Sequence, residues 1–257
     1  MVVKYQVPSV TLAAQMLKLL SRHKYKCCSL KDIAERLDAS PTTCLRILRT
    51  LEAENFVHFN VETKKYSLGP YLIPLGNRAA ELNDVVASAT AEMKRIASKT
   101  GLTTVLIQRW DDRLVYTASA EPPSERVRLS ISAGQQIPMT SGAHGRCFLA
   151  YEDEMEWNRF ILAGLRQVTP ASITDPDQFI EALREVRRRG YAISHGEITP
   201  GFSAVDVPIF AKSGRVDLVI SCMYVTSQMD ESHLSNLIKL LDSTSRQLSE
   251  WGGYALV

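Results

Sequence analysis

Residues 29–68 decide how the first part of this chain folds, and they read SLKDIAERLDASPTTCLRILRTLEAENFVHFNVETKKYSL. Ser29 opens a capping-box-like sequence that predicts a short helix. Asp38 and the alanine after it favour a tight turn. Ser40 then offers a capping hydroxyl, and Pro41 stands at the first helical position, where its missing N–H costs nothing. We therefore expect two helices joined by a short turn.

The second of these helices, which we expect to end near residue 54, has two different faces. Leu45, Leu48 and Leu51 recur at helical spacing and are expected to face the core. The residues outside that stripe bear hydroxyls or positive charge: Thr42, Thr43, Arg46, Arg49 and Thr50. Two β-rich stretches, 56–61 and 65–68, flank a polar turn and predict a hairpin, or wing.

Two helices joined by a short turn and followed by a hairpin are typical of a winged helix-turn-helix. Its second helix enters the major groove of DNA, which is about 12 Å wide. Arginines suit guanine edges or phosphates, and hydroxyls near the helix start suit phosphate oxygens. The predicted DNA-binding residues are Ser40, Thr42, Thr43, Arg46, Arg49, Thr50, Lys64 and Lys65. The alternative is that these elements mediate only protein contacts.

The distribution of charge favours DNA binding by the first part of the chain. The chain has 257 residues, 45% of them hydrophobic, and a net charge of +2. Residues 1–76 hold eleven Lys and Arg against six Asp and Glu, a net charge of +5, which leaves −3 for the rest. A basic domain at one end of the chain is what attraction to phosphate requires.

Several kinds of site are not expected. The five cysteines are scattered and their one close pair is adjacent, which suits neither a disulfide framework nor a metal site. The five histidines show no H-x-x-x-H spacing, so we expect no metal and no cofactor. The sequence has no run of about 18 apolar residues and no signal-peptide pattern, which predicts a cytoplasmic protein with no membrane association.

The remaining periodicity predicts an α+β protein. A helix capped by Ser9 precedes the helix pair, and an amphipathic helix ending at Gly101 follows the wing as a connector. Strands are expected at 103–110, 113–120 and 126–133, and again at YAISH, AVDVPIF and DLVISCMYV. Helices are expected from about residue 145, at 152–165, at 176–189 and after Asp230. The predicted domains are a winged helix-turn-helix at 1–76, a linker helix at 77–101 and an antiparallel-sheet domain at 102–257.

Several segments together carry a specific resemblance to a known family. After the wing come GPYLIPLG at 69–76, MTSGAHGRCFLA at 139–150, LREVRRRGYAISHGE at 183–197 and GFSAVDVPIFAKSGRV at 201–216. With the helix pair, they resemble the DNA-binding domain, effector-loop motif and later strands of the IclR family of bacterial transcriptional regulators. The similarity runs from about Ser9 to Gly252.

This resemblance implies a winged helix-turn-helix, a linker helix that helps the protein dimerise, a GAF-like effector-binding domain and no catalysis. We therefore expect a ligand-responsive, sequence-specific transcriptional regulator, a repressor of a catabolic operon. The expected partners are a palindromic operator with half-sites about 10 bp apart, and a second copy of the chain in a homodimer or dimer of dimers. The expected effector is an organic acid, a lactone or an aromatic metabolite.

The resemblance also indicates which residues bind the effector. The loop at 140–145 precedes a helix whose free N–H groups suit an anionic or carbonyl oxygen, although a plain turn capping that helix would have the same sequence. The residues carried over are Gly142, Ala143, Ser194, His195, Ala204, Asp206, Ser221 and Met223. Three positions depart from the family pattern: Asp38 where glycine is usual, Ala204 where many members have cysteine, and Asp206 where a small apolar residue is usual.

Asp206 leads to a hypothesis about the effector. Strand alternation places Asp206 on the same side as Ala204, so a carboxylate would face the pocket and disfavour a simple dicarboxylate. An effector with a hydroxyl, lactone, amide or cationic group would then suit the site, with His195 as partner of Asp206. The alternative is that Asp206 caps a buried turn or pairs with Arg215.

The sequence leaves two alternative functions. An enzyme could use His195 and Asp206 with Ser221 or Cys222, but the chain has no G-x-S-x-G, no phosphate-binding glycine loop and no H-E-x-x-H motif. A basic winged helix-turn-helix is also not something that an enzyme needs. A DNA-binding dimer without any small-molecule effector is the other alternative.

Overall fold

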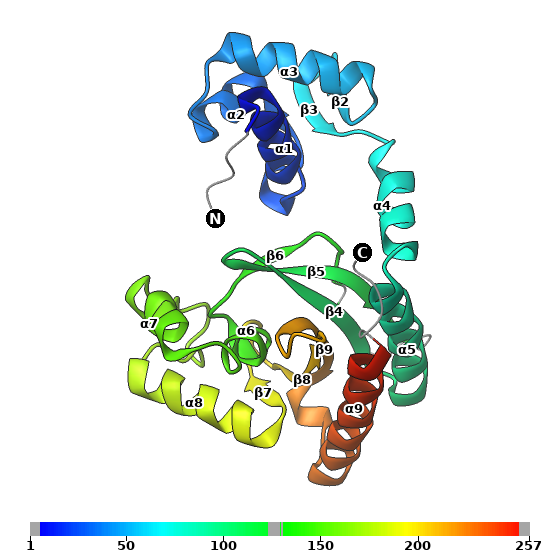
Figure 1. The fold of residues 1–257 in the computed structure, drawn as a ribbon, viewed down its shortest axis with the longest axis vertical. Coiled ribbons are helices and arrows are strands. Elements are labelled where there is room, and N and C mark those ends of the chain that lie inside the picture. Colours follow the sequence, from blue (N-terminus) through cyan, green and yellow to red (C-terminus); the bar gives the residue numbers. More distant parts are fainter. Residues whose placement is uncertain (1–5, 123–128, 130, 252–257) are drawn as a thin grey trace. The chain divides into compact units, whose positions relative to one another are not determined.

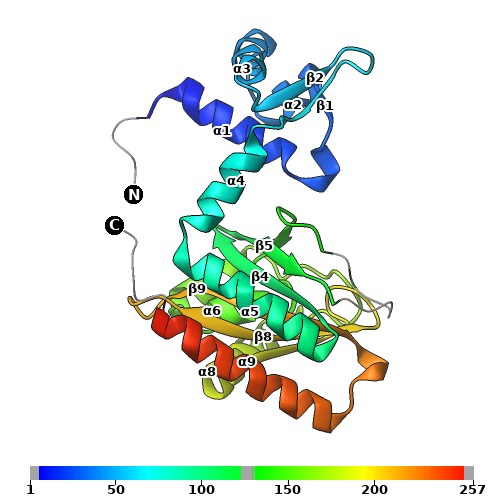
Figure 2. The same ribbon diagram turned by 90° about the vertical axis from the view of Figure 1, so that its right-hand side faces the viewer.

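A computed structural model of the protein describes residues 6–122, 129 and 131–251. The chain folds into two compact units, Met1–Leu82 and Asn83–Val257 (Figures 1 and 2). In the described part of the chain, every helix is too short or too polar to cross a membrane.

The first unit contains the expected helix pair and hairpin. Its elements are α1 (Pro8–Leu20), η1 (His23–Tyr25), β1 (Cys28–Ser29), α2 (Leu30–Arg36), α3 (Pro41–Ala53), β2 (Val57–Asn60), β3 (Lys65–Leu68) and α4 (Leu72–Glu81). The three strands form an antiparallel sheet in the order β1-β3-β2, with β2 and β3 as the two strands of the wing. This arrangement confirms the predicted winged helix-turn-helix.

Local hydrogen bonds set the ends of α2 and α3. Ser29 and Asp32 form a capping box, in which the Asp32 N–H donates to Ser29 Oγ and the Ser29 N–H donates to Asp32 Oδ2. Asp38 adopts a positive φ of 49° in the turn, a conformation that aspartate tolerates better than most residues. Ser40 Oγ accepts from the N–H of Thr43 at 3.1 Å, so α3 begins where the sequence predicted.

The core of the first unit differs from the expectation at two residues. Cys44 and Leu48 are the buried side chains of α3, whereas Leu45 is 38% exposed. Leu48 is buried and Leu51 packs against the same core, as predicted, so of the three leucines only Leu45 is wrong. Ser9 lies inside α1, which begins at Pro8 and follows Val7 without a side-chain cap.

The second unit consists of one sheet and its covering helices. Its elements are α5 (Asp84–Thr100), β4 (Thr103–Trp110), β5 (Arg113–Ala120), β6 (Gln136–Pro138), α6 (Gly142–Leu149), α7 (Glu154–Leu162), α8 (Pro176–Arg189), β7 (Ala192–His195), β8 (Phe202–Phe210), β9 (Val216–Val225), η2 (Thr226–Gln228) and α9 (Glu231–Trp251). The six strands pair antiparallel in the order β6-β5-β4-β9-β8-β7.

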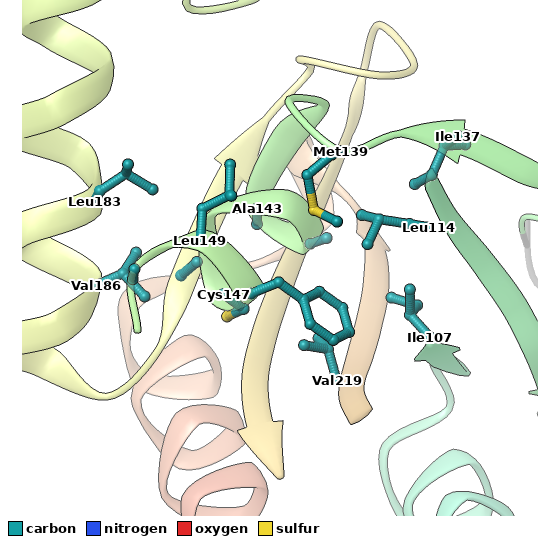
Figure 3. Packing of buried hydrophobic residues seen from close by; sticks show 14 of the residues in the cluster. Ile107, Leu114, Ile137, Met139, Ala143, Cys147, Leu149, Leu183, Val186 and Val219 are labelled. Carbon is teal, nitrogen blue, oxygen red and sulfur yellow. The ribbon is translucent and has the colours of Figure 1, made fainter. Parts of the chain in front are cut away.

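The two faces of this sheet bury separate hydrophobic clusters. Helices α5 and α9 contact each other and pack on one face, which we call the α5/α9 face (Figures 1 and 2). Helix α6 packs on the opposite face, between the sheet and α8, and we call this the α6 face. Figure 3 shows Leu149 of α6 between Val186 of α8 and Val219 of β9. The sheet is therefore buried on both sides.

Helix α6 lies unusually close to the loop before it. All eight of its residues are buried, and a Cβ on Gly145 would lie 1.6 Å from the carbonyl oxygen of Met139. Since no side chain fits there, glycine at this position allows the helix to approach residue 139. Helix α6 begins at Gly142, three residues earlier than the sequence suggested.

Two predicted segments differ in the structure. The expected third strand at 126–133 lies partly outside the described residues, and its described part is not a strand; β6 pairs with β5 instead. The expected single linker helix is two helices, α4 and α5, that belong to different units and are separated at Leu82 and Asn83. Helix α5 ends at Gly101, as expected. The role of residues 77–101 as a linker remains a prediction.

Candidate functional site

Helix α3 presents a continuous polar surface to solvent. Its buried side, formed by Cys44 and Leu48, faces the core of the first unit. The eight predicted DNA-binding residues are all exposed: Ser40, Thr42, Thr43, Arg46, Arg49, Thr50, Lys64 and Lys65. Six of them belong to α3 or its cap, and the two lysines lie at the wing. The fold therefore brings the predicted residues to two neighbouring elements of one unit.

The two arginines of α3 are held differently. Arg49 forms an ion pair with Glu52 at 3.0 Å, and its guanidinium lies 5.6 Å from the centre of the Phe59 ring on the wing. Arg46 has no carboxylate partner among the described residues. An unpaired guanidinium presents all its donors to a guanine edge or a phosphate without first breaking an ion pair.

Two threonine hydroxyls already have local partners. Thr43 Oγ1 lies 2.8 Å from Ser40 Oγ, and Thr50 Oγ1 donates to the carbonyl oxygen of Arg46 at 3.1 Å. These bonds orient the hydroxyls but leave oxygen lone pairs available. In the wing turn, Lys64 has a positive φ of 54°, and the following Lys65 begins β3.

Leu45 is a surface residue that the sequence pattern assigned to the core. Its position three residues after Thr42 and four before Arg49 places it on the same side of α3 as those side chains. An exposed apolar side chain among DNA-contacting groups suits the methyl group of thymine. Cys44, the residue before Leu45, takes the core position at this end of the helix.

The candidate effector residues come together mainly on the α6 face of the second unit. Ser194, Ala204 and Met223 stand directly opposite one another on β7, β8 and β9, so they share one face. Ala204 and Met223 belong to the cluster that packs against α6. One step along the strands, Asp206 stands opposite Ser221 on that same face.

The start of α6 lies next to this row. Gly142 has a positive φ of 61°, and a Cβ there would lie 2.9 Å from Cδ1 of Ile198 and 3.8 Å from Oγ of Ser194. Ala143 is buried in the same cluster (Figure 3). The first N–H groups of a helix have no partner within the helix, so α6 offers donors at this end.

Asp206 is fully buried and bonded to α6. His144 Nδ1 donates to Asp206 Oδ2, and the Tyr116 hydroxyl lies 3.1 Å from His144 Nε2. Burial and the nearby Asp206 charge raise the pKa of Tyr116, so the phenol keeps its proton. The other carboxylate oxygen, Asp206 Oδ1, has no partner among the described residues, and neither has Ser221 Oγ.

The expected partners of Asp206 are wrong. Adjacent residues of a strand point to opposite faces, so His195 lies on the other face from Ser194, where its Nδ1 is 3.1 Å from Ser203 Oγ. Arg215 instead pairs with Glu152 at 3.3 Å. His144 and Tyr116 are the residues that sequence reasoning missed. Their spacing along the chain gives no signal, because 62 residues separate His144 from Asp206.

In the part of the chain that the structure describes, neither a group of metal ligands nor the cavity beside α9 coincides with this site. Among the described residues, no group of three or more His, Cys, Asp or Glu side chains is placed to hold a metal ion. A cavity of about 900 Å³ opens between the end of α5 and the start of α9, and of the eight candidate effector residues it includes only Met223. The polar groups around Asp206 lie outside that cavity.

Comparisons with known proteins cover both units of the chain. Residues 9–60 match the IclR helix-turn-helix domain, and residues 77–250 match the C-terminal domain of the bacterial transcriptional regulator IclR. The HTH-type transcriptional repressor AllR of Escherichia coli is 26% identical over 222 residues, which cover 86% of this chain and 82% of AllR.

Two solved structures are similar over nearly the whole chain. An IclR transcriptional regulator from Alicyclobacillus acidocaldarius has 54% identity and a TM-score of 0.92, covering 97% of this chain and all of that one. An IclR homologue from Microbacterium hydrocarbonoxydans, solved with 4-hydroxybenzoate, has 17% identity and a TM-score of 0.79. The match covers 95% of this chain and 98% of that one. The second likeness shows the fold alone.

These regulators bind DNA and are not enzymes, and the comparisons cover both units of the chain. The chain belongs to the IclR family of bacterial transcriptional regulators, as an effector-responsive DNA-binding protein.

Proposed function

We propose that this protein is a homodimeric repressor that binds a palindromic operator through α3 and the wing, and that a small molecule on the α6 face controls its affinity for DNA. The observation that carries the DNA-binding part is the surface of α3. Its buried side is apolar, while every predicted contact residue on it is exposed. A regulator of this kind acts where the chromosome is, in the cytoplasm.

The proposal of a dimer rests on α4. This helix has no buried residue, and it exposes Ile73 (66% exposed) and Leu75 (42%), with Leu82 (68%) directly after its end. A second copy of the chain is the occupant that also fits a palindromic operator, because two-fold symmetry in the protein matches two-fold symmetry in the site. A dimer of dimers would use a further surface.

The proposal of an effector site rests on the start of α6. Its free N–H groups lie beside the row from Ser194 to Met223, on the face that contains unpartnered hydroxyl and carboxylate oxygens. An acceptor group of the effector, such as a carboxylate or a carbonyl, would bind at the N–H groups of Gly142 and Ala143. The relative solved with 4-hydroxybenzoate makes that compound a reasonable first probe.

Operator binding is tested with DNA from upstream of the protein's own and neighbouring genes. We expect Arg46→Ala and Arg49→Ala each to weaken binding by about 1–3 kcal/mol if the side chain contacts a guanine. The measurement is fluorescence anisotropy over a series of salt concentrations, since a DNA-binding protein loses affinity steeply as salt rises.

Arg78→Ala is the matched control for these variants. It removes the same charge from α4, where Arg78 pairs with Glu81 at 3.1 Å, and should leave operator affinity nearly unchanged. Equal affinity in the wild type, Arg46→Ala and Arg49→Ala proteins would show that α3 does not read the operator. If the protein shows no salt-sensitive preference for any of these DNA sequences, the proposal that it is a DNA-binding regulator is wrong.

Effector control is tested by adding candidate compounds to the protein–operator complex. A thermal-shift screen of small acids, lactones and aromatic metabolites identifies binders, and release of the operator by a binder supports a repressor. A ligand can change DNA affinity only as far as it binds the two states of the protein unequally. If binders increase DNA affinity, the protein is not a ligand-released repressor; if the whole screen finds none, the DNA-binding dimer without an effector is favoured.

A further inference from the structure

The hydrogen-bond chain that ends at Asp206 uses only one of the two carboxylate oxygens. Tyr116, His144 and Asp206 are each at most 2% exposed, so water does not compete for these bonds. A carboxylate accepts, so the proton on His144 Nδ1 bonds to Oδ2, and the phenol of Tyr116 can donate to His144 Nε2. In this arrangement both ring nitrogens are satisfied, and Oδ1 alone remains unpaired.

Other oxygen atoms without hydrogen-bond partners lie across the sheet from Asp206, on neighbouring strands. Ser221 stands opposite Asp206, Val105 stands opposite Ser221, and Ser119 stands opposite Val105, so all of them lie on the α6 face. Asp206 Oδ1, Ser221 Oγ and Ser119 Oγ are all buried and lack hydrogen-bond partners among the described residues. A buried acceptor left unpaired costs about 1–3 kcal/mol, which the donors of a bound molecule would offset.

The arginine of α6 is already paired. Arg146 binds Glu197 through two hydrogen bonds of 2.6 and 2.7 Å. Arg146 and Glu197 are both buried, so their charges cancel within the domain. Arg146 is therefore not free to neutralise a second carboxylate. A ligand carboxylate at this point would meet a like charge in a dry environment.

We propose that Asp206 Oδ1, with Ser221 Oγ, binds a hydrogen-bond donor of the effector, a hydroxyl, an amide N–H or an ammonium group. This inference rests on the proposed effector site and adds its chemistry: an acceptor of the ligand lies at the start of α6 and a donor at Asp206. Tyr116 and His144 are positioning residues, since they fix the carboxylate without touching the ligand.

Two probe series with a common carboxylate end test this inference. The aromatic series is 4-hydroxybenzoate, 4-(aminomethyl)benzoate, 4-methoxybenzoate and terephthalate. The aliphatic series is 5-hydroxypentanoate, 5-aminopentanoate, pentanoate and glutarate. Each dissociation constant is measured by calorimetry on the full chain. We expect the hydroxyl or amine member of at least one series to bind at least tenfold more tightly than the members without a donor, because hydrogen bonds to charged groups are worth about 1.5–3 kcal/mol.

Asp206→Asn is the main variant. It keeps the size of the side chain and an acceptor for His144 but turns the free position into a donor. We expect Asp206→Asn to bind the hydroxyl or amine probe at least tenfold more weakly than the wild type does, and to bind the dicarboxylate more tightly. Asp217→Asn, the same change at an exposed position near the start of β9, is the control and should leave the order of affinities unchanged.

Ser221→Ala is the second variant, in case Asp206→Asn does not fold. Because Ser221 Oγ has no partner among the described residues, its loss should not destabilise the protein, yet it should weaken the donor-bearing probe by about fivefold.

Three results would overturn the inference. If dicarboxylates bind the wild type best, or if Asp206→Asn and Ser221→Ala leave the affinity for the donor-bearing probe unchanged, the inference fails while the proposed effector site stands. If no probe in either series binds, although operator binding is intact, the unpartnered oxygens hold only water. The inference then fails together with the effector part of the proposed function, and the DNA-binding part is unaffected.

Discussion

Glu156 shows how single ion pairs fix the outer helices of the second unit. Its carboxylate accepts from Arg159 at 2.8 and 2.9 Å and also pairs with Arg109 of β4. Hydrogen bonds from Arg159, followed by those from Arg109, lower the pKa of Glu156 to about 2, against an ordinary value of 4.5. Helix α7 is thereby tied to the strand beside it by charge as well as by packing.

The pKa of Glu156 predicts a specific dependence of stability on pH. A lowered folded-state pKa means that the pair stabilises the fold above pH 4.5 and loses that effect as pH falls toward 2. We expect Glu156→Gln to be less stable than the wild type by about 1 kcal/mol at pH 6, a value limited by solvent screening, and the gap to shrink by pH 3.

Urea unfolding followed by tryptophan fluorescence measures this gap, since all three tryptophans lie in the second unit. Glu154→Gln is the control, because Glu154 is exposed and makes no ion pair within the described residues. A gap that does not change between pH 6 and pH 3 would contradict the assignment.

Gly145 sets the position of helix α6, and the position of α6 in turn sets where His144 lies. The close approach of Gly145 to the Met139 carbonyl places His144 against Asp206, so packing of the helix and geometry of the effector site are linked. The ion pair of Arg146 with Glu197 ties the same helix to the loop between β7 and β8. Ile198 of that loop covers Gly142.

A pair of glycine substitutions tests the role of this close approach. We expect Gly145→Ala to destabilise the second unit by about 1–3 kcal/mol or more, because the added methyl group would overlap the Met139 carbonyl. Gly76→Ala is the matched control: nothing lies within 4 Å of its added methyl group, and alanine favours a helix by about 0.5–1 kcal/mol.

Tryptophan fluorescence reports the second unit, and circular dichroism reports both. Gly76→Ala should leave the fluorescence transition in place, since Gly76 belongs to the first unit. Equal fluorescence midpoints for wild type and Gly145→Ala would show that the helix can move away from residue 139 at no cost.

Assembly of the whole molecule is proposed to depend on the apolar face of α4. Leu75 lies on that face, while Asn77 and Arg78 lie on the polar side of the helix. We expect Leu75→Lys to weaken dimerisation at least tenfold, because a charge would be buried without a partner, and to weaken operator binding with it. Sedimentation of the purified protein measures the first effect and anisotropy the second.

Asn77→Lys adds the same charge on the other side of α4 and should leave the dimer intact. If Leu75→Lys and the wild type sediment alike over a concentration series, the dimer forms through another surface. Operator affinity that falls although the dimer persists would instead place Leu75 near the DNA.

The local elements of this protein follow from its sequence because their causes lie within a few residues. The Ser29 and Ser40 caps, the turn at Asp38 and the end of α5 at Gly101 each depend on neighbouring backbone groups. Hydrophobic periodicity likewise predicted most of the helices and strands and, with the quoted motifs, the α+β class.

The partners of buried side chains were decided only by the tertiary structure. Ser194 and His195 were both assigned to the effector site, but strand alternation separates them, and only pairing with β8 determines which of them faces α6. Cys44 is buried and Leu45 is exposed, because packing of α1 and α2 against α3 decides which side chain at this end of α3 faces the core. His144 meets Asp206 because α6 approaches the sheet closely at Gly145, and a contact between residues so distant in the chain leaves no mark in the local pattern of either.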